Sequence, residues 1–138
     1  MNSIIEIHDS EVAEIGECDG TVAVHFQSVY LHKSEGRPAY DSGTGWVQEA
    51  RLVISEASVS GDFPDWPCSM VGGEIILDGE RHCNLIPVPL EVRKLTELRL
   101  ICDDIHTVTI KGRGVRLELV GVPRYVEEVP HGAWNSCS

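Results

Sequence analysis

Hydrophobic and polar residues alternate with a period of two through most of the chain. In residues 21–26, TVAVHF, the apolar side chains Val22, Val24 and Phe26 share one parity, and residues 115–119 repeat the pattern. Because successive side chains of a strand point to opposite faces, this alternation predicts half-buried antiparallel strands. The strands are expected at 4–7, 11–18, 21–33, 46–60, 73–77, 80–86, 97–102, 105–111 and 115–120, with a short edge strand at 122–129.

Turn residues separate these segments. Asp19-Gly20 and Asp78-Gly79 are Asp-Gly pairs between apolar runs, which is a strong signal for a two-residue hairpin turn. Gly112–Gly114 predicts a third hairpin turn. The strongest helical pattern, residues 89–100, fits a strand as well, so at most a short helical turn near 90–96 is expected.

Two predicted strands change apolar parity midway. The even positions of 21–26 give way to Val29 and Leu31, and the even positions of 46–54 give way to Ala57 and Val59. One inserted residue reverses the faces of a strand, so bulges or bends are expected near 27–29 and 55–57. The alternative is an unbroken strand that exposes Val29 and Leu31 as a dimer surface.

The predicted fold is therefore all-β: one antiparallel β-sandwich, or a closed or partly open β-barrel, of about eight strands with little or no helix. The chain of 138 residues suits a single domain over 1–138, with a frayed tail at about 131–138.

The net charge of −11 limits the kinds of molecule that the protein is expected to bind. Residues 1–80 hold fifteen Asp and Glu against three Lys and Arg, whereas residues 81–138 hold seven against eight. An acidic chain without a basic stripe repels phosphate backbones, so neither nucleic acid nor an anionic membrane is expected as a partner. No signal peptide is recognisable, which favours a cytoplasmic location. The five cysteines include no CxxC pair, so reduced thiols are expected.

The segment IHDSEV, residues 7–12, places His8, Asp9 and Ser10 side by side. Neighbouring residues cannot form a serine–histidine–aspartate relay, and the chain has no GxSxG elbow, so a turn between two strands is the better interpretation. The six histidines lack the spacing of a zinc site. No catalytic residue, metal ligand or cofactor is predicted. Arg93, Arg99, Arg113, Arg116 and Arg124 could bind an anion if they clustered, although pairing with acids is the commoner role.

The loop DFPDWP, residues 62–67, is the candidate interaction site. Phe63 and Trp66 are held by prolines beside Asp62 and Asp65, and stiff aromatics are common interface anchors. The alternative is a lid over the open end of the core. Glu11, Glu14, Glu17 and Glu49 are expected to form one acidic sheet face next to the loop.

These patterns favour a non-enzymatic protein-interaction module, either of the inhibitor or immunity type with a basic partner protein, or homo-oligomeric, for example a homodimer. One alternative is a β-barrel that binds a small apolar or anionic ligand in its mouth. A second alternative is an enzyme whose site is assembled from scattered residues.

Overall fold

A computed structural model describes residues 1–132 of the chain. It contains twelve strands, and no helix occurs in the described residues. Consequently, no helix in residues 1–132 is long and apolar enough to cross a membrane. The strands are β1 (Asn2–Cys18), β2 (Thr21–Ser34), β3 (Gly43–Ser55), β4 (Ser58–Gly61), β5 (Cys68–Ser69), β6 (Gly72–Leu77), β7 (Glu80–Cys83), β8 (Leu85–Val88), β9 (Glu91–Val92), β10 (Thr96–Ile101), β11 (Thr107–Gly112) and β12 (Gly114–Val129).

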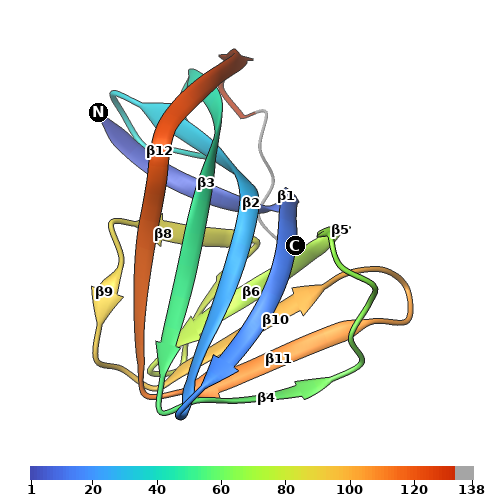
Figure 1. Ribbon diagram of the computed structural model, residues 1–138. Helices are drawn as coiled ribbons and strands as arrows, with labels where there is room; N and C mark the ends of the chain where they lie inside the picture. The colour runs from blue at the N-terminus through green and yellow to red at the C-terminus, as the bar shows by residue number, and fades with distance from the viewer. Residues whose placement is uncertain (133–138) are drawn as a thin grey trace.

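The strands form two antiparallel sheets. In sheet A the order is β5-β1-β2-β3-β12-β9, with β8 also paired to β1; in sheet B it is β4-β11-β10-β6-β7. Figure 1 shows β1, β2, β3 and β12 as the long strands of sheet A, with sheet B lying against their lower part. The two sheets are open and do not close into a barrel. Twelve strands replace the eight or so expected, because several strands contain only two to four residues.

The core lies between the two sheets. Val24, Phe26 and Leu52 of sheet A and Leu98 and Ile110 of sheet B are fully buried and belong to one hydrophobic cluster. Removing apolar surface from water is the main stabilising term in folding, so this alternation of inward side chains holds the layers together.

Two of the three predicted hairpins are confirmed. Cys18 pairs with Thr21 and Leu77 with Glu80, and both Asp-Gly turns have positive φ at their two central residues, as a type I′ turn requires. The hairpin at Gly112–Gly114 is wrong. Here the chain leaves β11 of sheet B and enters β12 of sheet A. A Cβ on Gly112 would overlap Ser55 and Ala57, so close packing of the two sheets explains that glycine.

The first parity change is a bulge, as predicted. The pairing of β2 with β3 skips between Phe26 and Val29, and Val29 and Leu31 are fully buried. The second is a bend, the other form that the prediction allowed, and it carries the chain from one sheet to the other. The chain ends β3 at Ser55, passes Glu56 with φ of 47°, and begins β4 in sheet B at Ser58.

The turn expected at His8–Ser10 is not a turn, because β1 continues through it. The pairing with β2 skips between Glu6 and Glu11, and Asp9 takes a φ of 70°. The buried Ser10 hydroxyl donates to the Glu6 carbonyl at 2.6 Å and accepts from the Tyr30 N–H at 3.2 Å. These two bonds replace backbone hydrogen bonds that the interrupted β1–β2 pairing lacks. Serine, which was predicted from the sequence to be a turn residue, therefore stabilises a bulge here.

The segment 122–129 is not a separate short strand but the end of β12. The pairing of β12 with β3 skips between Val120 and Arg124 and again between Tyr125 and Glu127. Gly121 has a φ of 75°, which lets the strand bulge ahead of Pro123 and continue. Of the tail predicted at 131–138, residues 133–138 lie outside the described residues.

Candidate functional site

The loop 62–67 connects the edge strand β4 of sheet B to β5 at the edge of sheet A. Trp66 is partly buried and packs against the core, and Pro64 is buried. Phe63 is 48% exposed. Asp62 and Asp65 are exposed as well. Trp66 therefore covers the gap between the sheets, which is the lid arrangement, and Phe63 is the aromatic side chain left at the surface.

The predicted single acidic face does not form. Register places Glu14 beside His25 of β2, followed by Arg51 of β3, so basic side chains interleave with acidic ones. The His25 Nε2 lies 2.6 Å from Glu49 Oε2. Glu17 pairs with the buried Val22 and therefore has the opposite parity to Glu14. The odd separation of these two glutamates in the sequence already indicates opposite faces.

Titratable side chains gather at the bulge of β1. Burial raises the pKa of the Glu6 carboxyl, although a hydrogen bond from Asn84 opposes the shift. Burial, followed by the hydrogen bond to Glu127, raises the pKa of Tyr30. His8 Nδ1 lies 3.3 Å from Asp9 Oδ2 and is half exposed. These are separate pairwise contacts, and in none of them does a base contact a serine, threonine or cysteine nucleophile, so they form no relay of the hydrolase kind.

Two of the thiols within the described residues are held in their protonated, poorly nucleophilic form. Burial raises the pKa of Cys102 to about 12 and also raises the pKa of Cys68, which keeps both protonated at neutral pH. Cys18, Cys68 and Cys102 are free. Cys83 is disulfide-bonded, so the prediction of five reduced thiols is wrong. Cys137 lies outside the described residues. Among residues 1–132, no three His, Cys, Asp or Glu side chains are placed to hold a metal ion.

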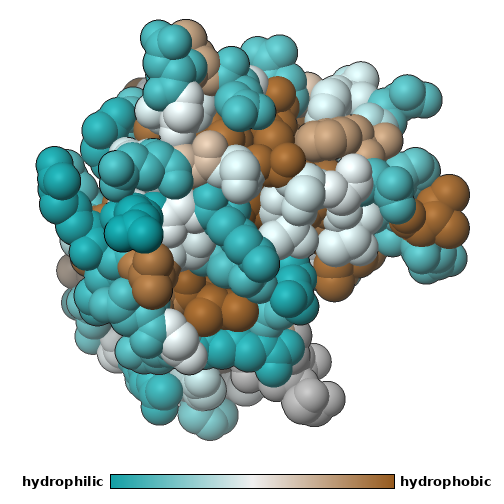
Figure 2. All heavy atoms as spheres, turned by 90° about the horizontal axis from the view of Figure 1, so that it is seen from below, coloured by the Kyte–Doolittle hydropathy of each residue, from teal (hydrophilic) through white to brown (hydrophobic). Residues whose placement is uncertain are grey.

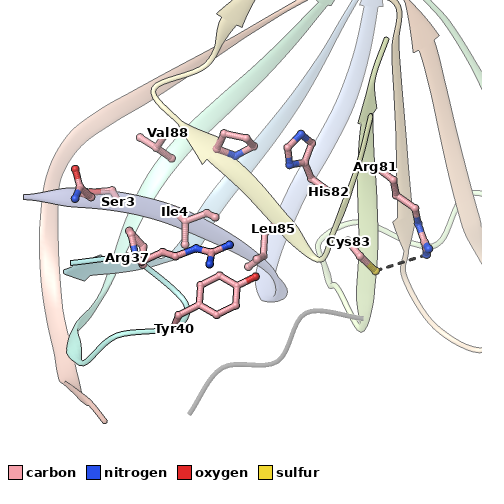
Figure 3. A pocket seen from close by; sticks show the side chains of 12 residues that line it. Ser3, Ile4, Arg37, Tyr40, Arg81, His82, Cys83, Leu85 and Val88 are labelled. Atoms are coloured by element: carbon pink, nitrogen blue, oxygen red, sulfur yellow. Dashed lines mark hydrogen bonds between the residues drawn. The ribbon is translucent and has the colours of Figure 1, made fainter. Parts of the chain in front are cut away.

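A groove of about 570 Å³ opens beside the start of β1. Figure 3 shows Ile4 and Leu85 on its wall, with Arg37 and Tyr40 reaching in from the loop between β2 and β3. The Arg37 guanidinium stacks 3.9 Å from the centre of the Tyr40 ring. Arg81, the other arginine of the groove, is hydrogen-bonded to Glu74. Both cations are thus already engaged within the protein.

Exposed apolar side chains concentrate on β12. The described residues include twelve large apolar side chains that are exposed, and five of them belong to this strand. We call these five the β12 strip: Leu119, Val120, Val122, Tyr125 and Val126. Val122 at the first bulge is 88% exposed. Beyond Val115 and Arg116, which pair with β9, the outer edge of β12 has no strand partner in the described part of the chain.

Acidic and basic side chains flank the β12 strip. Glu118 and Arg124 share the outer face of sheet A, because register aligns them with His25 and Tyr30, which lie on either side of the β2 bulge. Glu127 and Glu128 follow on the same strand. On the opposite face Tyr125 meets the Trp46 ring edge-on, with 5.5 Å between the ring centres. The strip thus follows the edge of β12 with side chains on both faces of the sheet, and charges of both signs lie beside it.

Three of the five arginines considered from the sequence come together. Arg93, Arg113 and Arg116 line a groove of about 450 Å³ where β3 ends and β12 begins. Arg99 lies elsewhere and bonds to Glu74 and Glu97, and Arg124 lies within the β12 strip segment. Figure 2 looks onto this lower end, where small apolar groups are separated by hydrophilic side chains.

Comparisons with known proteins give no relative: no family model matches the chain, and no curated protein or solved structure matches it. Sequence reasoning missed the β12 strip, which the structure makes the largest concentration of exposed apolar side chains. The signal was present as the apolar residues around Pro123, which keeps a strand at a sheet edge. The sequence could not show that side chains on both faces of this segment are exposed, because that depends on β12 being the outer long strand of sheet A.

Proposed function

We propose that this protein is a non-enzymatic interaction module with a sandwich-like fold, and that it associates with a second copy of itself through the β12 strip. The observation that carries the proposal is the β12 strip itself. Apolar side chains gathered on one unpartnered edge, with charged residues beside them, are typical of a protein contact surface. A core filled by side chains of both sheets supports this reading over a ligand held inside a barrel.

The chemistry of β12 supports a second copy as the partner. A two-fold axis beside Gly121 would place Glu118 of one copy opposite Arg124 of the other, since each residue is three positions from the axis. Glu118 would keep its bond to Arg116 of its own chain and present its carboxylate to both arginines. The Glu118–Arg124 contact then occurs twice, as in any isologous interface. Opposite charges therefore face each other where the two copies meet, although the protein as a whole is acidic.

Side chains rather than a continuous strand ladder make this contact. Pro123 has no N–H to donate, and the bulges at Gly121 and Val126 twist the edge, which are features that prevent open-ended strand pairing. The module therefore forms a closed pair rather than a fibre. Sedimentation velocity across a wide concentration series compares three chains: the wild type, Val122→Asp/Val126→Asp and the control Val71→Asp.

We expect wild-type chain and the Val71→Asp control to shift from monomer to dimer as concentration rises, because Val71 is exposed but lies between β5 and β6. The Val122→Asp/Val126→Asp variant should remain monomeric with an unchanged circular dichroism spectrum. A wild-type chain that stays monomeric at every concentration would overturn self-association, as would a dimer that survives both aspartates.

A further inference from the structure

The arginine groove at the lower end of sheet A carries a second inference, independent of the β12 strip. Its arginines come from three separate places: Arg93 follows β9, Arg113 links β11 to β12, and Arg116 belongs to β12. The adjacency of β3, β12 and β9 brings these segments side by side. The groove therefore exists only in the folded chain.

Two of these guanidinium groups have no acidic partner within the described residues. Arg116 donates to Glu118 at 2.8 Å. Arg93 and Arg113, in contrast, form no ion pair with any residue of 1–132, although the protein carries twenty-two Asp and Glu residues. Elsewhere Arg81 and Arg99 both bind Glu74. Arg37, Arg51 and Arg124 also form no ion pair within residues 1–132, but only Arg93 and Arg113 of these five line the same groove.

Glu56 and Glu91 also line the groove and set a limit on what it can bind. Arg116 is neutralised by its ion pair with Glu118, and Glu91 lies directly across from it in the β9–β12 pairing. Arg93 and Arg113 therefore supply the available positive charge, and Glu56 opposes it. An arginine fork matches the planar or tetrahedral oxygens of an oxyanion and binds it through charge-assisted hydrogen bonds.

We propose that Arg93 and Arg113 form a binding site for a doubly charged oxyanion group of the phosphate or sulfate kind. The backbone beside them leaves room for such a group. Gly114 adds no side chain to this wall, where a Cβ would lie in ordinary contact 3.6 Å from the Val92 carbonyl oxygen. The Ser55 hydroxyl at the end of β3 offers a further donor.

Nuclear magnetic resonance of the full chain tests this site with inorganic phosphate and with sulfate, each against chloride at the same ionic strength. Backbone amides of residues 91–93 and 113–116 should shift and saturate with phosphate and sulfate but not with chloride. Arg93→Gln/Arg113→Gln should raise the dissociation constant at least about tenfold, which corresponds to loss of charge-assisted bonds. Arg51→Gln, which changes an exposed arginine of β3 outside the groove, should leave the dissociation constant unchanged.

Glu56→Gln supplies an effect of opposite sign, because removing a carboxylate that faces the anion should tighten binding. O-phosphoserine identifies the source of the group: tighter binding than inorganic phosphate indicates a phosphorylated molecule, and equal binding indicates the free ion. Equal shifts with chloride would overturn the site. So would full affinity in Arg93→Gln/Arg113→Gln, or no gain in Glu56→Gln.

Discussion

The loop 62–67 and the β12 strip both bring apolar side chains and acids to the surface, but they have different surroundings. The loop spans the open side between the sheets, where Trp66 packs on the core. The β12 strip lies on the outermost long strand, where five apolar side chains have no layer above them. An aromatic side chain in a stiff loop can thus pack onto the core, whereas valines on an uncovered sheet edge can form a contact surface.

The largest expected effect separates these two roles by stability. Trp66→Ala should lower the free energy of unfolding by about 2 kcal/mol, below the range for a fully buried tryptophan because Trp66 is only partly buried. Phe63→Ala should change it by no more than about 0.5 kcal/mol, as for an exposed residue. Urea denaturation of both variants measures the difference. Equal losses would show that the loop folds onto the core as one unit and would blur the comparison.

The second prediction concerns the charges beside the β12 strip and rests on the proposed self-association. Arg124→Glu should weaken the dimer about fivefold, or about 1 kcal/mol for two symmetric exposed pairs. Adding Glu118→Arg should restore affinity by exchanging the two signs. Sedimentation of the single and double variants tests this. A double variant as weak as the single one would exclude the Glu118–Arg124 contact while leaving the apolar contact in place.

Parts of this contrast follow from the sequence. The Asp-Gly turns and the parity change at Phe26–Val29 were predictable, because turn chemistry and side-chain period act locally. The changes of sheet after Ser55 and Gly112 were not, since a sheet switch and a bulge or hairpin leave the same local pattern. Pro123 suggested a separate short strand, but the bulge at Gly121 carries β12 past it.

The candidate sites were less predictable than the fold. The sequence singled out the loop aromatics because their composition is unusual, whereas the β12 strip consists mainly of common aliphatic residues. Its significance comes from its position beside β9, which pairs with only two residues of β12. The arginine groove likewise depends on which segments the sheet order brings together. Of the five arginines considered from the sequence, only three share a groove.

The third prediction examines how firmly the β12 strip is held by the sheet. The edge-on contact between Trp46 and Tyr125 should give a coupling free energy of about 0.5–1.5 kcal/mol in a double-mutant cycle. Trp46→Leu, Tyr125→Leu and the double variant are to be compared by urea denaturation at a concentration where the chain is monomeric. A coupling near zero would mean that Tyr125 is free to move and is no fixed part of the strip.

The smallest expected effect compares a buried acid with the exposed acids of the loop. Burial raises the pKa of Glu6, so the folded state disfavours its charged form. The stability that depends on protonated Glu6 is complete below the ordinary value of 4.5 and is lost as pH rises through the folded-state pKa. Glu6→Gln can still accept the hydrogen bond from Asn84 and avoids that loss. Its stability should therefore equal that of wild type in acid and exceed it at neutral pH.

Asp62→Asn/Asp65→Asn should stay within about 0.5 kcal/mol of wild type throughout, because both side chains are exposed. Urea denaturation from acid to neutral pH measures all three chains. A Glu6→Gln curve parallel to wild type would show that the bulge of β1 holds the glutamate charged without cost, and that burial does not distinguish it from the loop aspartates.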